Sequence, residues 1–84
     1  MIHVITEETW STPKGPIESQ PIGPPRLIDS KPSREEAELC AMALSAEYHH
    51  HGYNAEGDGE RGCWWGRDED AHEVHRFVVR PATA

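Results

Sequence analysis

The sequence predicts an α+β fold, in which one helix packs on a small three-stranded antiparallel sheet. Three patterns lead to this prediction. A stripe of apolar residues at helical spacing follows Ser33, glycines alternate with aromatic residues after Gly52, and the last segment alternates between two faces. The expected elements, in chain order, are a helix at about 33–51 and strands at about 53–56, 62–67 and 72–80.

The first 31 residues are predicted to be a proline-rich, extended arm. Five of the seven prolines fall between Pro13 and Pro25, and proline supports neither a helix interior nor an inner strand. The β-branched start at 2–5 predicts either a short edge strand or a frayed end. The chain is therefore expected to divide into an arm at 1–31, one domain at 32–81 and a tail at 82–84.

Both ends of the expected helix carry a sequence signal. Residues 33–36 read Ser-Arg-Glu-Glu, a capping box in which the serine hydroxyl accepts from the third amide and the last glutamate reaches back. Gly52, after three histidines, suits the left-handed residue that ends a helix. Between these ends, one apolar stripe recurs at helical spacing: Ala37, Cys40, Ala41, Leu44 and Tyr48.

The strand at 72–80 assigns its side chains to two faces by alternation. Phe77 and His75 share one face. An even loop before this strand would place Trp64 opposite His75 and toward the helix, with Trp65 on the other face. An odd loop, or a bulge in the middle strand, would exchange the two tryptophans.

Composition favours binding over catalysis. Only 36% of the 84 residues are hydrophobic, so the core must be small, and we expect neither an enzyme nor a cofactor cavity. Fifteen acidic and eight basic residues give a net charge of −7, which repels phosphate backbones and anionic lipid. We therefore expect a protein partner with a basic surface, no direct contact with nucleic acid or membrane, and no cofactor.

The cysteine content and the start of the chain predict a cytoplasmic protein. Two cysteines are fewer than a small secreted domain usually carries, so both are interpreted as reduced thiols. Cys40 is interpreted as a small buried hydrophobe within the helical stripe. The first residues lack the basic and apolar parts of a signal peptide, and no apolar run approaches the roughly 20 residues of a membrane-spanning helix.

Acidic residues gather in the two expected loops between the strands, which the predicted topology places at opposite ends of the helix. They are either solvated loop faces or a surface that imitates phosphates and occupies a basic groove on another protein. A tryptophan beside them is either an apolar anchor for a partner or a packing site for the arm. The predicted partner-binding residues are Glu56, Asp58, Glu60, Asp68, Glu69, Asp70, Trp64 and Trp65.

Histidines near the expected helix end give an alternative function, a metal-binding or metal-sensing module. A zinc site needs three or four ligands that converge as a tetrahedron. Within 72–75, two histidines stand three residues apart on a strand, so they point to opposite faces and do not chelate together. Favourable interaction of histidines with the helix dipole is the competing interpretation. The ligand set for this alternative is His49, His50, His72, Asp68 and Asp70.

Three segments in the second half, 51–53, 64–68 and 75–79, resemble short bacterial and prophage reading frames, a resemblance that implies no function. Small acidic single-domain chains are also similar to anti-CRISPR proteins and other phage anti-defence inhibitors. Those proteins share size and charge but no common motif, so no residue role is carried over. The resemblance implies inhibition by binding, with a basic nucleic-acid-binding groove as the target.

Overall fold

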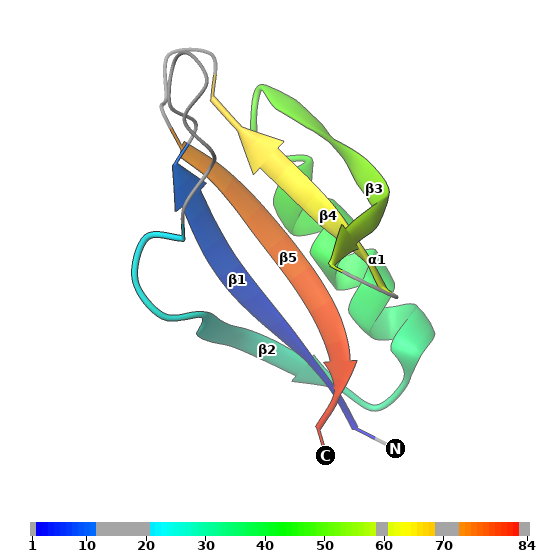
Figure 1. Cartoon of the computed structure of the whole chain (residues 1–84). Helices are drawn as coiled ribbons and strands as arrows, with labels where there is room; N and C mark the ends of the chain where they lie inside the picture. Colours follow the sequence, from blue (N-terminus) through cyan, green and yellow to red (C-terminus); the bar gives the residue numbers. More distant parts are fainter. Residues whose placement is uncertain (1, 12–20, 59–60, 69–72, 83–84) are drawn as a thin grey trace.

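The computed structural model describes residues 2–11, 21–58, 61–68 and 73–82, and shows a five-stranded antiparallel sheet with one helix on one face (Figure 1). In space the strands follow the order β2-β1-β5-β4-β3. The elements are β1 (His3–Ser11), β2 (Arg26–Lys31), α1 (Arg34–Ser45), β3 (His50–Asp58), β4 (Arg61–Arg67) and β5 (Glu73–Pro81).

The prediction of a three-stranded sheet is wrong, because the segment interpreted as an arm supplies two further strands. β1 lies between β2 and β5, so it is an inner strand of nine residues and not an edge strand at 2–5. Ile5 pairs with Val79 of β5 and with Asp29 of β2. The five prolines that argued against strands all fall after β1 and before β2 in the sequence, so neither strand contains one.

The helix begins where the sequence predicts and ends earlier. The Ser33 hydroxyl accepts a hydrogen bond from the Glu36 amide at 3.2 Å, as expected for a capping serine. The last helical residue is Ser45, and Ala46 is the C-cap. The predicted end at Gly52 is therefore wrong, since Gly52 lies within β3. The strand at 53–56 likewise begins earlier than predicted, at His50.

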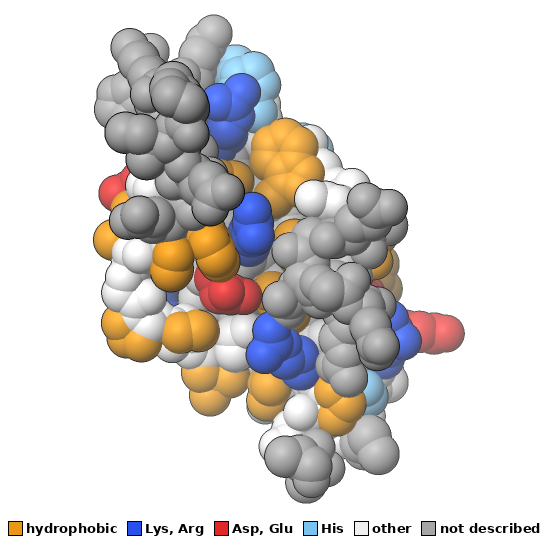
Figure 2. Space-filling model, in the orientation of Figure 1, with side chains coloured by type: hydrophobic (Ala, Val, Ile, Leu, Met, Phe, Trp, Pro, Cys, Tyr) orange, Lys and Arg blue, Asp and Glu red, His pale blue; other side chains and the backbone are white. Residues whose placement is uncertain are grey.

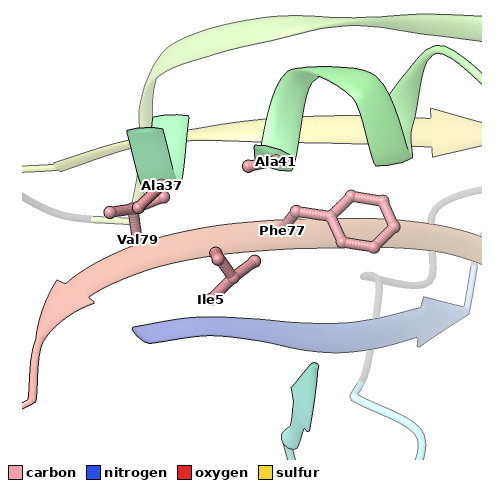
Figure 3. Close-up of a cluster of buried hydrophobic side chains, with 5 residues drawn as sticks. All are labelled: Ile5, Ala37, Ala41, Phe77 and Val79. Atoms are coloured by element: carbon pink, nitrogen blue, oxygen red, sulfur yellow. The ribbon is translucent and has the colours of Figure 1, made fainter. Parts of the chain in front are cut away.

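A small apolar core lies between α1 and the strands β1 and β5 (Figure 3). Ala37 and Ala41 are fully buried, and their small side chains let the helix approach β1 and β5 closely. They pack on Ile5, Phe77 and Val79. Around this cluster lie the partly buried side chains of Cys40, Leu44, Tyr48 and Trp64. The predicted stripe is thus the buried face of α1 as far as Leu44, and Tyr48 packs on the core from beyond the end of the helix.

Of the two arrangements left open for the tryptophans, the structure has the one with Trp64 toward the helix, in a shifted register. Trp64 pairs with Phe77 on the helix side, and Trp65 pairs with Arg76 on the opposite side. The predicted partner of Trp64 was His75, which pairs with Gly66 instead. A shift of two residues preserves every face assignment because side chains alternate with a period of two.

The two cysteines lie on opposite sides of the sheet. Cys40 is on the core side of α1, while Cys63 precedes Trp64 in β4 and therefore faces away from the helix. Both are free thiols. Cys63 and Val78 are fully enclosed on that second side, so the sheet buries side chains on both faces. Within the described part of the chain, no helix has the length and apolar character required to cross a membrane.

Candidate interaction surfaces

Of the predicted acidic residues, the structure places one side chain. Asp68 follows β4 and is exposed. Glu56 and Asp58 belong to β3, but their side chains are outside the described set. Glu60, Glu69 and Asp70 lie outside the described residues altogether. The acidic loop surface therefore stays a prediction.

The histidines of the alternative metal site are only partly placed. His49 and His50 follow α1 and are in edge-to-face contact, with ring centroids 4.8 Å apart. Asp68 lies at the same end of the sheet, because His50 pairs with its neighbour Arg67. His72 and Asp70 are outside the described residues. Among the residues that are described, no group of three or more His, Cys, Asp or Glu side chains is arranged to hold a metal ion.

Trp64 is anchored to the helix and does not project from the surface. Its indole Nε1 donates to Glu38 Oε2 at 2.7 Å, and Arg34 Nε lies 3.6 Å from the other oxygen of that carboxylate. Its ring also contacts Tyr53, with centroids 4.8 Å apart. The carboxylate satisfies the indole donor while the ring contributes to the core. Trp64 is therefore a core residue, and Trp65 is the tryptophan that faces away from the helix.

Trp65 covers Gly52 on the sheet face opposite α1. A Cβ atom added at Gly52 would lie 3.1–3.2 Å from three neighbouring atoms of the indole, Cζ2, Cε2 and Nε1. Nearly equal distances to adjacent ring atoms mean that the ring passes over the glycine and lies along the strand backbone. The side chain is half-buried. Trp65 therefore forms a flat aromatic cover on β3 and β4.

Arginines accompany this indole. Arg76 is the direct cross-strand partner of Trp65, and its guanidinium carbon lies 4.6 Å from the centre of the Trp10 ring. Arg67 and Arg80 are exposed and project to the same face by strand alternation. Figure 2 looks onto this face and shows Lys and Arg side chains distributed among hydrophobic ones. We call Trp65, Arg67 and Arg76 the sheet surface.

The outer side of α1 carries a surface of different character. Leu39 is 60% exposed and Met42 is 41% exposed. Glu35 and Glu36, both exposed, stand one turn before Leu39. An open groove of about 550 Å³ adjoins them, lined by Lys31, Glu36, Leu39 and Cys40. We call Glu35, Glu36, Leu39 and Met42 the helix surface; sequence analysis did not single it out as a binding site.

A polar cluster lies on the helix side of the sheet, beyond the apolar core. Glu7 of β1 forms an ion pair with Arg26 of β2 at 3.0 Å, although the Glu7 side chain is only 14% exposed. His75 Nδ1 lies 3.3 Å from the Thr9 hydroxyl and 3.7 Å from Glu7 Oε2. The Tyr48 ring stacks on His75, with centroids 4.9 Å apart and planes 18° from parallel.

The geometry of this cluster is not that of a nucleophilic triad. In a triad the carboxylate and the nucleophile engage different nitrogens of the histidine, so that one orients the ring while the other gives up its proton. Here Thr9 and Glu7 both approach Nδ1 of His75. Sequence analysis missed the cluster because it assigned Glu7 and Thr9 to the arm. Their alternation with Ile5 was the signal that could have placed them on one strand face.

Tyr48 gives the cluster a testable pH dependence. Burial raises the pKa of its phenol above the ordinary value of 10.0, and the negative charges of Glu7, Asp68 and Glu47 act in the same direction. The folded state therefore keeps the proton where the unfolded chain releases it. The contribution of Tyr48 to the free energy of unfolding is fully present below the unfolded-state pKa of 10.0. It is lost as pH rises through the raised pKa of the folded state.

We expect urea midpoints measured at increasing alkaline pH to fall less steeply for Tyr48→Phe than for the wild-type protein, because phenylalanine has no phenol to ionise. Tyr53→Phe, at a 48% exposed ring, is the matched control and should retain the wild-type slope. Equal slopes for the two variants would show that Tyr48 does not carry the effect.

The chain matches no protein-family model, and comparisons with curated proteins and with solved structures give no match either.

Proposed function

We propose that this chain is a non-enzymatic binding protein that inhibits or modulates a larger protein partner with a basic surface. The helix surface is the observation that carries the proposal. Leu39 and Met42 are neighbours on α1 and are 60% and 41% exposed, with two exposed glutamates on the preceding turn. An apolar centre with a charged border is the usual anatomy of a protein interface.

Charge complementarity selects a basic partner. Glu35 and Glu36 stand in the first turn of α1, and the whole chain has a net charge of −7. A basic surface would be attracted over a distance set by the Debye length, about 10 Å at 0.1 M salt. Exposed Asp68 lies near the other end of α1, where Gly66 of the preceding strand meets Ser45 and Tyr48, and would give a second negative site.

The non-enzymatic part of the proposal rests on size and on the polar cluster. Eighty-four residues with 36% hydrophobic content leave little chain to enclose a substrate. In the cluster, Glu7 and Thr9 share one nitrogen of His75, an arrangement that suits mutual stabilisation better than proton relay. The most specific form of the proposal follows the likeness in size and charge to anti-CRISPR proteins: the acidic surface occupies a basic nucleic-acid-binding groove.

The test is capture of a partner from a bacterial lysate, with wild-type protein and two charge-matched double variants. Glu35→Gln with Glu36→Gln removes two charges from the helix surface. Glu47→Gln with Glu73→Gln removes two exposed charges elsewhere. We expect the first variant to lose the captured protein and the second to retain it. Capture should also weaken as NaCl rises from about 50 to about 500 mM, because salt screens exposed charges.

A third variant separates the apolar contact from the charges. Leu39→Ser removes apolar area from a residue that contributes little to the core, since 60% of it is exposed. We expect it to weaken capture while circular dichroism shows an unchanged fold. Capture that is equal for the wild-type protein, Leu39→Ser and the Glu35 and Glu36 double variant would contradict the proposed surface.

A further inference from the structure

The sheet surface differs in charge and shape from the helix surface and lies on the other side of the molecule (Figures 1 and 2). The Trp65 indole rests against β3 at Gly52, and its half-buried side chain leaves part of the ring accessible on this face. Such a ring protects a glycine in a strand, which is a structural role. It also presents a flat aromatic area, which a planar group can stack on.

Two arginines are neighbours of Trp65 in the sheet. Arg76 is its cross-strand partner, which places the two Cα atoms about 4.5–5.5 Å apart. Arg67 lies two residues further along the same strand and face, a rise of about 6.7 Å. Trp10 holds the Arg76 guanidinium against the sheet through its ring, 4.6 Å from centroid to carbon. The platform and its cations are therefore built into three neighbouring strands: β1, β5 and β4.

The net charge of −7, from which we expected no direct contact with nucleic acid, is not distributed evenly over the chain. Four of the acidic residues, Glu35, Glu36, Glu38 and Glu47, are on α1 or directly after it, on the far side of the sheet. Asp29 shares a face with core residue Ile5, its cross-strand partner. On the same face as the sheet surface, Glu8 is the cross-strand partner of Arg76, and its negative charge offsets part of the arginine charge. Among the side chains that the structure describes on this face, three arginines, Arg67, Arg76 and Arg80, stand beside one acid, Glu8.

We propose that the sheet surface binds single-stranded nucleic acid, with one base stacked on the outer face of Trp65 and the neighbouring phosphates contacted by Arg67 and Arg76. Stacking on aromatic side chains and pairing of arginines with the backbone are the two components of sequence-tolerant single-strand binding. An acidic polypeptide would satisfy the arginines but has no use for the indole face. The inference is independent of the proposed function, because it uses neither the helix surface nor a basic partner.

The experiment measures fluorescence anisotropy of a labelled oligothymidylate of about 15 nucleotides, within the site sizes of single-strand binding modules, at about 50 mM NaCl. Trp65→Phe keeps an aromatic ring over Gly52, whereas Trp65→Leu keeps an apolar cover without a π face. We expect Trp65→Phe to bind nearly as well as wild type and Trp65→Leu to bind about 5- to 150-fold more weakly, the factor for one stacked base.

Arg67→Gln tests the phosphate contact at an exposed position where the fold is not at risk. It should lower the slope of log affinity against log salt by about 1. Arg34→Gln removes the same charge from a 71% exposed side chain on α1 and should leave the slope unchanged.

Three outcomes would overturn the inference. The first is an anisotropy of the oligothymidylate that does not change with added wild-type protein. The second is equal affinity for Trp65→Leu and Trp65→Phe. The third is displacement of the oligonucleotide by polyglutamate as effectively as by unlabelled oligothymidylate, which would assign the surface to an acidic protein. Loss of lysate capture with unaltered oligonucleotide binding would contradict only the proposed function.

Discussion

Ile5→Ala is expected to lower the free energy of unfolding by about 2–5 kcal/mol, the range for truncating a fully buried isoleucine. Ile5 has no exposed surface and lies in the core cluster with Phe77 and Val79. Its removal leaves a cavity beneath Ala37 and Ala41, on a helix whose alanines cannot expand to fill it. A domain of this size has only about 5–15 kcal/mol of stability in total, so the loss is a large part of it.

Urea denaturation followed by circular dichroism measures this loss, and Ile22→Ala is the matched control. Ile22 lies outside the strands and is 46% exposed, so the same change should cost less than about 0.5 kcal/mol. If Ile5→Ala cost no more than Ile22→Ala, residues 3–11 would behave as a loose arm and the five-stranded sheet would be contradicted.

Gly66→Ala is the second substitution with a large expected effect. A Cβ atom at this position would lie 2.5 and 2.8 Å from two atoms of the Tyr48 ring and 2.9 Å from the Ser45 carbonyl oxygen. Real structures do not tolerate such distances, so the tyrosine and the end of α1 must move. We expect a loss of about 1–3 kcal/mol in unfolding free energy, the usual cost of overpacking.

A double-mutant cycle identifies the cause of that loss. In a Tyr48→Ala background the ring contacts are gone and only the Ser45 carbonyl remains close to the added methyl group. Gly66→Ala should therefore cost less there than in the wild-type protein, with an interaction energy of about 0.5–3 kcal/mol. Equal costs in both backgrounds would show that the ring does not limit the space at Gly66.

The helix and the last two strands of the fold, α1, β4 and β5, could be predicted from local sequence patterns. The capping serine and the 3–4 spacing of Ala37, Ala41 and Leu44 identified the start and the buried face of α1. Alternation identified β5 and limited Trp64 and Trp65 to opposite faces, but it left open which of the two faces the helix, and the register expected for the even loop was two residues off. Face assignment needs only parity, whereas register depends on the loop between two strands, which sequence patterns specify poorly.

β1 and β2 were not predicted from the sequence, because the proline content of residues 13–25 concealed the alternation of the strand before them. Proline excludes strand pairing only at its own position and its immediate neighbour, and β1 contains none. The pairing of β1 with β5 joins residues about 70 positions apart, such as Ile5 and Val79. Contacts at that separation leave no periodic signal in a single sequence. Alternation could have placed Glu7 and Thr9 on one strand face, but their position beside His75 is set only by this long-range pairing.

The end of α1 was misplaced because two helix-ending signals were in competition. Gly52 is of the residue type that most often terminates a helix, whereas the apolar stripe extends only to Tyr48. In the structure the Ser45 hydroxyl donates to the Met42 carbonyl at 2.8 Å, and the Tyr48 amide donates to the Ser45 carbonyl at 3.1 Å. These hydrogen bonds give partners to the carbonyl groups of the last helical turn, so no left-handed glycine is required there. Gly52 instead provides the space beneath Trp65.

Native-state hydrogen exchange of the β1 amides tests the central claim most directly, namely that residues 3–11 form an inner strand on which both surfaces depend. β1 is paired on both sides, with β2 and with β5. We predict that the amides of Ile5, Thr6 and Glu7 are protected to a degree comparable with those of Phe77, Val78 and Val79. Exchange of the β1 amides at the rate of an unstructured chain, while β5 stays protected, would contradict the account.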